Sequence, residues 1–378
     1  MKIIVLGSGL VGAPMAMDLA KDHQFQVSIA DKSQSQLDRV PTDFPIQKWV
    51  RDLSDTNQLK ELVKDFDLVL NAVPGFMGFQ TLKSIIEVGK DVVDISFFPE
   101  DPFQLHQLAL EKNVIAIMDC GVAPGMSYIL AAYAAKKMDK CERIAIYVGG
   151  LPKIRIQPFE YKAVFSPIDV IEEYTRPSRF KQNNEIVIKP ALSDLESMDF
   201  DGIGTLEAFN SDGLRSLLQT IDCPDMIEKT LRYPGHVDKM KFLREMGLFS
   251  ENVIDVNGVS IRPIDLTAKL MFPMWELKAG EEDLTVMKII VSGQIGGKTK
   301  TYTYYLFDSF DTTTQVHSMA RTTGYTATMA VRMLAASLYS KRGISPPEYI
   351  GDYPECVQFL LDGLKERNVV YRESIREE

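Results

Sequence analysis

The first residues that could do chemistry form a G-x-G-x-x-G pattern close to the N-terminus. The glycines at positions 7, 9 and 12 follow the apolar run Lys2–Leu6, and a helical pattern comes after them. In such a turn the first glycine permits a tight bend, the second lets the backbone approach a pyrophosphate, and the third allows close packing of helix on strand. The sequence therefore predicts a dinucleotide-binding turn made by Gly7, Ser8, Gly9, Leu10, Val11 and Gly12.

An acidic residue, Asp31, stands nineteen positions after Gly12, where a second strand is predicted to end. A carboxylate at this place accepts the ribose hydroxyls of NAD and repels the 2′-phosphate of NADP, although Lys32 weakens that repulsion. We therefore expect NAD, with NADP less favoured. A solvated turn carboxylate is the alternative for Asp31. The ends of later strands are expected to line the same cofactor through Ala72, Val73, Pro74, Ile95 and Ser96; for Pro74, ordinary loop packing is an equal alternative.

Two further carboxylates, Asp94 and Asp119, close predicted buried strands. Ligands of open parallel sheets bind outside the carboxyl ends of the strands, so both are candidate catalytic residues. The alternative for Asp119 is a turn-forming role before Gly121, and the sequence does not decide which carboxylate lies nearer a nicotinamide. The four cysteines form no C-x-x-C pair, so we expect neither a disulfide framework nor a metal site.

The elements that must position these residues alternate between short apolar strands and helices over the first 120 residues. This alternation predicts an α/β fold with a Rossmann-type parallel sheet. The runs Leu284–Ile295 and Lys298–Phe307, joined across Gly296 and Gly297, predict a hairpin in an α+β second domain with a mainly antiparallel sheet. We expect residues 1–119 and 320–378 to form the nucleotide domain with returning C-terminal helices, residues 120–319 to form the second domain, and the tail Ile375–Glu378 to be frayed.

Composition narrows the class of partner. Hydrophobic residues make up 45% of the 378 residues and charged residues 25%, as in soluble globular proteins. The uncharged stretch Cys120–Ala135 is shorter than the ~20 residues that span a bilayer, so no membrane helix is expected. A formal charge of −10 opposes binding to nucleic acid or anionic membranes and favours a small-molecule partner. Because the N-terminus lacks a signal-peptide pattern, we expect a cytoplasmic protein.

Six segments carry a resemblance to a known family: GSGLVG (7–12), DCGVAPGM (119–126), YVGGLP (147–152), LEAFNSDG (206–213), KTLRYPGH (229–236) and ARTTGYT (320–326). With them the chain resembles the saccharopine dehydrogenase-like superfamily, and within it most closely the NAD-dependent L-lysine 6-dehydrogenases. Saccharopine reductases typically carry an aspartate and a cysteine where this chain has Ala123 and Val148. These departures argue against saccharopine itself as substrate.

The resemblance implies oxidative deamination of L-lysine at its ε-amine, giving an aldehyde, allysine, that cyclises to piperideine-6-carboxylate. The free amine has a pKa of about 10.4, so a base must accept a proton, and Asp119 or Asp94 is expected to serve. A cation must grip the α-carboxylate. The expected substrate-binding residues are Arg215, Thr230, Arg232 and His236, although a capping or packing role is an equal alternative for His236.

The resemblance also implies a homodimer formed through the second domain. Two other functions stay open at this point. One is a saccharopine or carboxynorspermidine-type reductase, which forms a C–N bond by the same hydride chemistry in reverse. The other is a non-catalytic NAD-binding redox sensor, which would need no acid or base near the nicotinamide.

Overall fold

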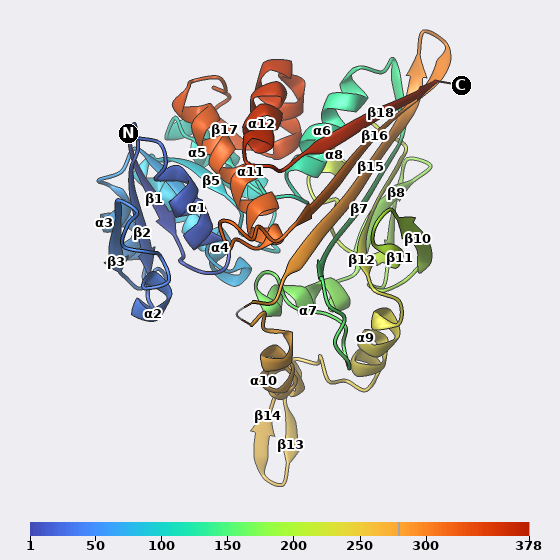
Figure 1. Cartoon of the computed structure of the whole chain (residues 1–378), viewed down its shortest axis with the longest axis horizontal. Helices are drawn as coiled ribbons and strands as arrows, with labels where there is room; N and C mark the ends of the chain where they lie inside the picture. The colour runs from blue at the N-terminus through green and yellow to red at the C-terminus, as the bar shows by residue number, and fades with distance from the viewer. Residues whose placement is uncertain (279, 378) are drawn as a thin grey trace. The chain divides into compact units, whose positions relative to one another are not determined.

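The computed structural model describes residues 1–278 and 280–377, and the chain divides into two units (Figure 1). Unit 1 contains Met1–Lys137 and Met319–Tyr371, and unit 2 contains Met138–Ser318 with the described residues 372–377. The sequence placed the first boundary near Asp119. The division after Lys137 has a physical reason, since helix α6 (Met126–Lys136) packs against the 3-10 helix η2 (Pro347–Asp352) within unit 1.

A parallel sheet forms the centre of unit 1 and confirms the predicted Rossmann-type domain. Over the residues that the structure describes it has seven strands, in the order β17-β6-β5-β4-β1-β2-β3. The strands are mostly continuous apolar runs, because both faces of a parallel sheet are largely buried. Their bounds are β1 (Lys2–Leu6), β2 (Gln26–Asp31), β3 (Ile46–Val50), β4 (Leu68–Asn71), β5 (Asp91–Asp94), β6 (Ile115–Ile117) and β17 (Gly343–Ser345).

The helices of unit 1 pack their apolar sides on this sheet, for example through Leu82, Ile85 and Ile86 against Ile4 and Val69. Two helices come from the C-terminal part of the chain, as the sequence predicted. The helical elements not yet given are α1 (Gly12–Leu19), α2 (Gln34–Leu37), α3 (Thr56–Val63), α4 (Gly75–Val88), η1 (Pro102–Leu105), α5 (His106–Glu111), α11 (Ser318–Ala335) and α12 (Pro354–Glu366).

A buried ion network fastens the returning helices to α1. The Asp18 carboxylate lies 2.8 Å from the Arg332 guanidinium and 2.9 Å from that of Arg367, and Thr328 donates its hydroxyl to it at 2.6 Å. Burial alone would raise the pKa of Asp18, but the two guanidinium charges hold it below its ordinary value. The network therefore holds α11 and the end of α12 against α1, the helix that follows the glycine turn.

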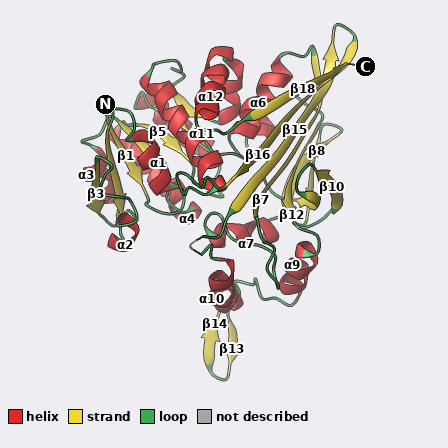
Figure 2. Ribbon diagram, viewed as in Figure 1, coloured by secondary structure: helices red, strands yellow, loops and turns green. Residues whose placement is uncertain are grey.

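Unit 2 is organised around a mixed sheet that is mainly antiparallel, as predicted. Its nine strands within the described ranges follow the path β10-β11-β12-β7-β15-β16-β18, with β8 paired to both β12 and β9. Figure 2 shows the long strands β7, β15 and β16 side by side. Their bounds are β7 (Lys140–Pro152), β8 (Ser178–Gln182), β9 (Glu185–Lys189), β10 (Glu196–Phe200), β11 (Gly204–Asn210), β12 (Asp225–Arg232), β15 (Asp283–Ile295), β16 (Lys298–Ser309) and β18 (Tyr371–Glu377).

Strand β18 corrects the expectation of a frayed tail. Residues up to Glu377 extend along β16, and the Glu377 carboxylate pairs with Lys298 at 2.6 Å and Lys300 at 3.1 Å. Cross-strand pairing of this kind is a long-range contact, which the polar sequence of the tail does not signal. The predicted hairpin across Gly296 and Gly297 is present, with both residues at positive φ (59° and 78°).

The helices of unit 2 enclose an aromatic core. The rings of Tyr161 and Trp275 meet edge to face at 5.2 Å, and Tyr174 packs on Phe209 and Trp275. The remaining elements are α7 (Pro167–Thr175), α8 (Leu217–Thr220), α9 (His236–Glu245), α10 (Pro263–Trp275) and a separate hairpin of β13 (Ile254–Val256) and β14 (Val259–Ile261). Among the helices of the described chain, none combines the length and the apolar character that crossing a bilayer requires.

Candidate functional site

The glycine turn between β1 and α1 has the geometry that its residue types predict. Gly7 adopts φ +99°, and a Cβ there would stand 2.7 Å from the carbonyl oxygen of Ala72. A Cβ on Gly12 would stand 2.0 Å from the carbonyl oxygen of Gly7, whereas one on Gly9 would meet nothing within 4 Å. The turn is therefore closed on its protein side and open at Gly9, at the N-terminus of α1. This is the arrangement that lets backbone N–H groups approach a diphosphate.

Asp31 ties the second strand to this turn. Its Oδ2 accepts the Ser8 N–H at 2.8 Å, and its Oδ1 accepts the Ser33 N–H at 2.8 Å. Each carboxylate oxygen has further lone pairs, so both can still accept ribose hydroxyls. Ser8 itself is buried and donates its hydroxyl to the Gln36 carbonyl at 3.1 Å. The predicted binding residues Ser8 and Asp31 thus belong to one hydrogen-bonded unit.

A second polar group lies at the carboxyl edge of the sheet, around Asp94 at the end of β5. Asn71 donates its amide to Asp94 Oδ2 at 2.9 Å, and Ser96 donates its N–H to Oδ1 at 2.6 Å together with its hydroxyl. Asp94 is 0% exposed. Burial raises its pKa to about 7 against these donors, and the negative charge of Asp119 adds to the rise.

The structure brings Asp94 and Asp119 together. The Cys120 N–H donates to the Asp94 carbonyl at 2.9 Å, which places the short segment after β6, with Asp119 in it, beside the end of β5. Asp119 is 2% exposed and adopts the left-handed conformation with φ 54°. A non-glycine residue rarely adopts this conformation without a structural or functional reason. The two candidate bases are therefore neighbours whose charges interact.

The other residues predicted to line a cofactor lie along the same edge. The Ala72 N–H donates to the Leu6 carbonyl at 2.9 Å, and the Ile95 N–H donates to the Asn71 carbonyl at 3.0 Å. Pro74 precedes α4 as its N-cap residue, and Leu10 is exposed. Sequence reasoning missed Asn71 as a partner of Asp94. The signal available was a polar residue closing an apolar strand.

In unit 2, Arg232 and His236 lie in one buried cluster. The Arg232 guanidinium is 2.7 Å from the Glu173 carboxylate, donates to the Tyr174 hydroxyl at 3.3 Å and lies over the Tyr161 ring at 4.6 Å. His236 Nδ1 must donate to the Phe159 carbonyl (2.9 Å), so Nε2 accepts from the Tyr174 hydroxyl (3.0 Å). Burial and the nearby Arg232 charge lower the pKa of His236 to about 3.

These contacts define what a substrate role would require in that cluster. Arg232 is 2% exposed, so a substrate carboxylate would have to replace Glu173 as its partner. His236 is neutral near pH 7 and both ring nitrogens are engaged. Thr230, on the same strand, donates its hydroxyl to Ser211 at 2.9 Å, and Arg215 is half-buried with φ 39°. The predicted substrate-binding roles of these four residues stay predictions.

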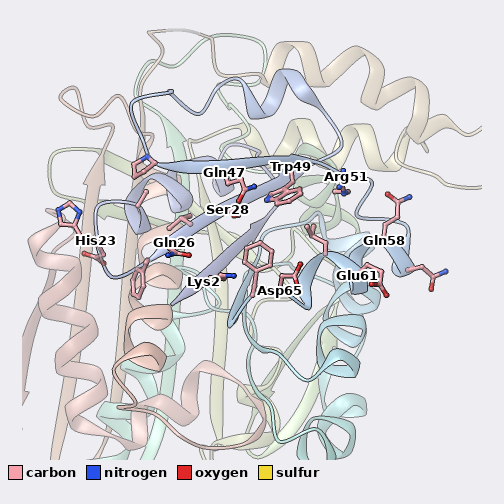
Figure 3. Close-up of a pocket in the computed structure, with 18 residues that line it drawn as sticks. Lys2, His23, Gln26, Ser28, Gln47, Trp49, Arg51, Gln58, Glu61 and Asp65 are labelled. Carbon is pink, nitrogen blue, oxygen red and sulfur yellow. The ribbon is translucent and has the colours of Figure 1, made fainter.

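Unit 1 also has an open groove of about 960 Å³ on one face of β2 and β3 (Figure 3). Ser28 and Trp49 form its floor, and Gln58 of α3 lines one wall. Lys2 and Gln26, from the amino ends of their strands, also border it, and so does Arg51, which follows the carboxyl end of β3. No predicted site residue lies in its described lining.

Among the described residues, no group of three or more His, Cys, Asp or Glu side chains could hold a metal ion.

Two family models match this chain and together cover most of it. The saccharopine dehydrogenase NADP binding domain matches residues 3–117, and the saccharopine dehydrogenase C-terminal domain matches residues 121–370. The chain belongs to the saccharopine dehydrogenase family. Its first unit is the Rossmann-type nucleotide-binding domain of that family, which confirms the resemblance at the level of the superfamily.

Relatives within this family have several names and lengths. Mouse mitochondrial alpha-aminoadipic semialdehyde synthase is 24% identical over 263 residues, 66% of this chain and 28% of that protein. Carboxyaminopropylagmatine dehydrogenase from Synechocystis is 22% identical over 98% of both chains. The structure is similar to that of apo saccharopine dehydrogenase (L-Glu forming) from Saccharomyces cerevisiae, with TM-score 0.81, 18% identity and 99% of each chain covered. The chain thus spans about a quarter to three fifths of the first relatives' lengths.

Proposed function

We propose that this protein is an NAD-dependent oxidoreductase acting on the CH–NH₂ group of an amino acid, and that it oxidises L-lysine at the terminal amine. The observation that carries the proposal is the pair Asp94 and Asp119 at the carboxyl edge of the sheet that bears the glycine turn. A sensor that only bound a nucleotide would need no such pair.

The nucleotide half of the proposal rests on the fit of the turn. The open space at Gly9 and the N-terminus of α1 suit the pyrophosphate, and Asp31 suits the ribose hydroxyls. The matching family model is named for NADP, which favours that cofactor. We nevertheless propose NAD, because a carboxylate at the end of the second strand of this fold accepts ribose hydroxyls and would repel a 2′-phosphate.

The chemistry that a bound nicotinamide supplies is acceptance of hydride from the carbon that carries the amine. The chain's own task is to manage protons. A general base must lie within reach of the proton that it takes, and Asp119 follows β6 at the carboxyl edge of the sheet, beside the end of β5. We assign Asp119 as the base that takes the proton of the substrate ammonium. Asp94, fixed by Asn71 and Ser96, tunes Asp119 through the charge between them.

A second candidate function is reductive C–N bond formation with a larger amino-acid or amine substrate. It is favoured by the match to carboxyaminopropylagmatine dehydrogenase over 98% of both chains and by the names of the saccharopine dehydrogenases. The same proton-handling pair would then protonate the nitrogen. Against saccharopine stand Ala123 and Val148 in the two segments described above.

The test is to incubate the purified protein with NAD or NADP and single substrates and to follow absorbance of the reduced nicotinamide. Reduction with L-lysine supports the first function. Reduction with saccharopine or a carboxyalkylated amine, but not with lysine, replaces it by the second.

Asp119→Asn should cut turnover by about 10² or more while NAD binding stays near normal. Asp67→Asn, an exposed carboxylate at the amino edge that accepts the Lys2 N–H, is the control and should keep full turnover.

A further inference from the structure

Two of the four cysteines lie side by side in unit 2. Strands β7 and β12 run parallel with Arg143 opposite Asp225, and Cys141 and Cys223 each stand two residues before this first pair. Neighbouring strands lie about 4.8 Å apart. This spacing falls within the ~4.4–6.8 Å between Cα atoms that a disulfide requires.

The two thiols also interact directly. Both cysteines are free, and their side chains are hydrogen-bonded to one another. The Cys223 thiol has a further contact with the Asp225 carbonyl at 3.3 Å. Cys223 is 0% exposed and Cys141 is 8% exposed, so the pair lies just beneath the surface of unit 2. The hydrogen bond from Cys141 lowers the pKa of Cys223, which makes Cys223 the sulfur that ionises first.

We propose that Cys141 and Cys223 are a reversible oxidation site, at which hydrogen peroxide forms a disulfide that cross-links β7 to the segment before β12. The Cys223 thiolate attacks one peroxide oxygen, the O–O bond breaks, and the sulfenic acid and water result. The Cys141 sulfur then attacks the Cys223 sulfur and displaces the second water. Two thiols and one peroxide thus give one disulfide and two waters, and a dithiol reductant reverses the change.

Peroxide suits this site because it is nearly as small as water and the pair is close to the surface. The cross-link would close a loop of about 80 residues that contains α7 and the strands β8–β11. Restricting a loop of that length in the unfolded chain stabilises the folded unit, so oxidation should raise the unfolding temperature of unit 2. The site does not depend on the proposed enzymatic function.

The experiment uses the full chain, fully reduced and then treated with hydrogen peroxide. We expect the intact mass to fall by about 2 Da, a non-reduced digest to contain a peptide joining Cys141 to Cys223, and dithiothreitol to restore both. The unfolding temperature should rise by about 5 °C or more. An unchanged mass, a mass gain from sulfinic acid at either residue, or a cross-link through Cys120 or Cys356 would overturn the proposal.

Variants separate this pair from the other thiols. Cys141→Ser and Cys223→Ser should each abolish the mass loss of about 2 Da that the wild type shows. Cys356→Ser is the matched control, because that buried thiol donates only to the Leu338 carbonyl and the variant should still form the cross-link. If the serine variants do not fold, the peptide map of the oxidised wild-type chain decides the question alone.

Discussion

Replacing Asp31 tests the choice of cofactor most directly. Two unit charges about 4 Å apart interact by roughly 1 kcal/mol in water and about 4 kcal/mol near a protein surface, and the half-buried Asp31 lies between these cases. Each hydrogen bond from a ribose hydroxyl to the carboxylate adds about 1.5–3 kcal/mol. We therefore expect Asp31→Ser to weaken NAD binding by about 10²-fold or more and to strengthen NADP binding by about 10-fold.

The assay is calorimetric titration of both dinucleotides into the wild type and the variant. Asp31 also accepts the N–H groups of Ser8 and Ser33, so a loss of fold has to be separated from a loss of charge. Asp31→Asn serves that purpose, because it keeps one oxygen acceptor and removes the charge. It should relieve the repulsion of NADP while preserving more of the turn.

One result would refute the reasoning. If the wild type already binds NADP more tightly than NAD, and removal of the charge leaves their ratio unchanged, the carboxylate does not face the 2′-position. The family model's name would then describe this chain's cofactor, and the role of Asp31 would be to hold the turn through Ser8 and Ser33.

Two further predictions concern the turn and the ion network that supports it. Gly12→Ala would place a Cβ 2.0 Å from the Gly7 carbonyl oxygen and should lose both dinucleotide binding and stability, whereas Gly9→Ala should keep its urea midpoint and lose only binding. A lower midpoint for Gly9→Ala would show that its surroundings are not open. Arg332→Met leaves the buried Asp18 carboxylate with one guanidinium partner fewer. It should lower the unfolding free energy, measured by urea denaturation, by about 3 kcal/mol. A change below about 0.5 kcal/mol would contradict the buried pairing.

The nucleotide half of the site could be predicted from the sequence because its signals are local. The glycine spacing fixes the turn within six residues, and the end of each apolar strand places Asp31, Asp94 and Asp119 at one edge of a parallel sheet. What the sequence did not give is the contact between Asp94 and Asn71, which lie 23 residues apart. Side chains at the ends of adjacent parallel strands meet only once the strand order is known.

The second unit was harder to predict because its polar groups meet over long distances in sequence. Arg232 pairs with Glu173, which lies 59 residues away in the chain. The sequence alone does not indicate this pairing, and it favours the interpretation of Arg232 as a surface cation available to a substrate. The short strands β3 and β17 were missed for a similar reason. Three to five residues carry little periodicity, and β17 pairs with β6 from the far end of the chain.

The raised pKa of Asp94 makes a prediction for stability that is independent of any substrate. Its carboxyl has a pKa of about 7 in the folded chain and about 3.9 when unfolded, so between pH 4 and 7 the folded state binds more protons. The unfolding free energy contributed by this group must then fall as the pH rises through that window, by up to about 4 kcal/mol in total. Ionisation of the buried carboxyl at higher pH is the physical cause.

Asp94→Asn removes the titrating group and keeps a carbonyl oxygen for the Ser96 donors. Relative to the wild type it should gain about 3 kcal/mol of stability between pH 5 and pH 8, measured by urea unfolding at each pH. Ser96→Ala should move the transition to higher pH, because the Ser96 hydroxyl lowers the pKa of Asp94. If the difference between wild type and Asp94→Asn is the same at both pH values, the carboxylate is ionised throughout, and the three donors from Asn71 and Ser96 outweigh its burial. Asp94 would then be a fixed negative charge beside Asp119, and it could not tune Asp119 by gaining or losing a proton near pH 7.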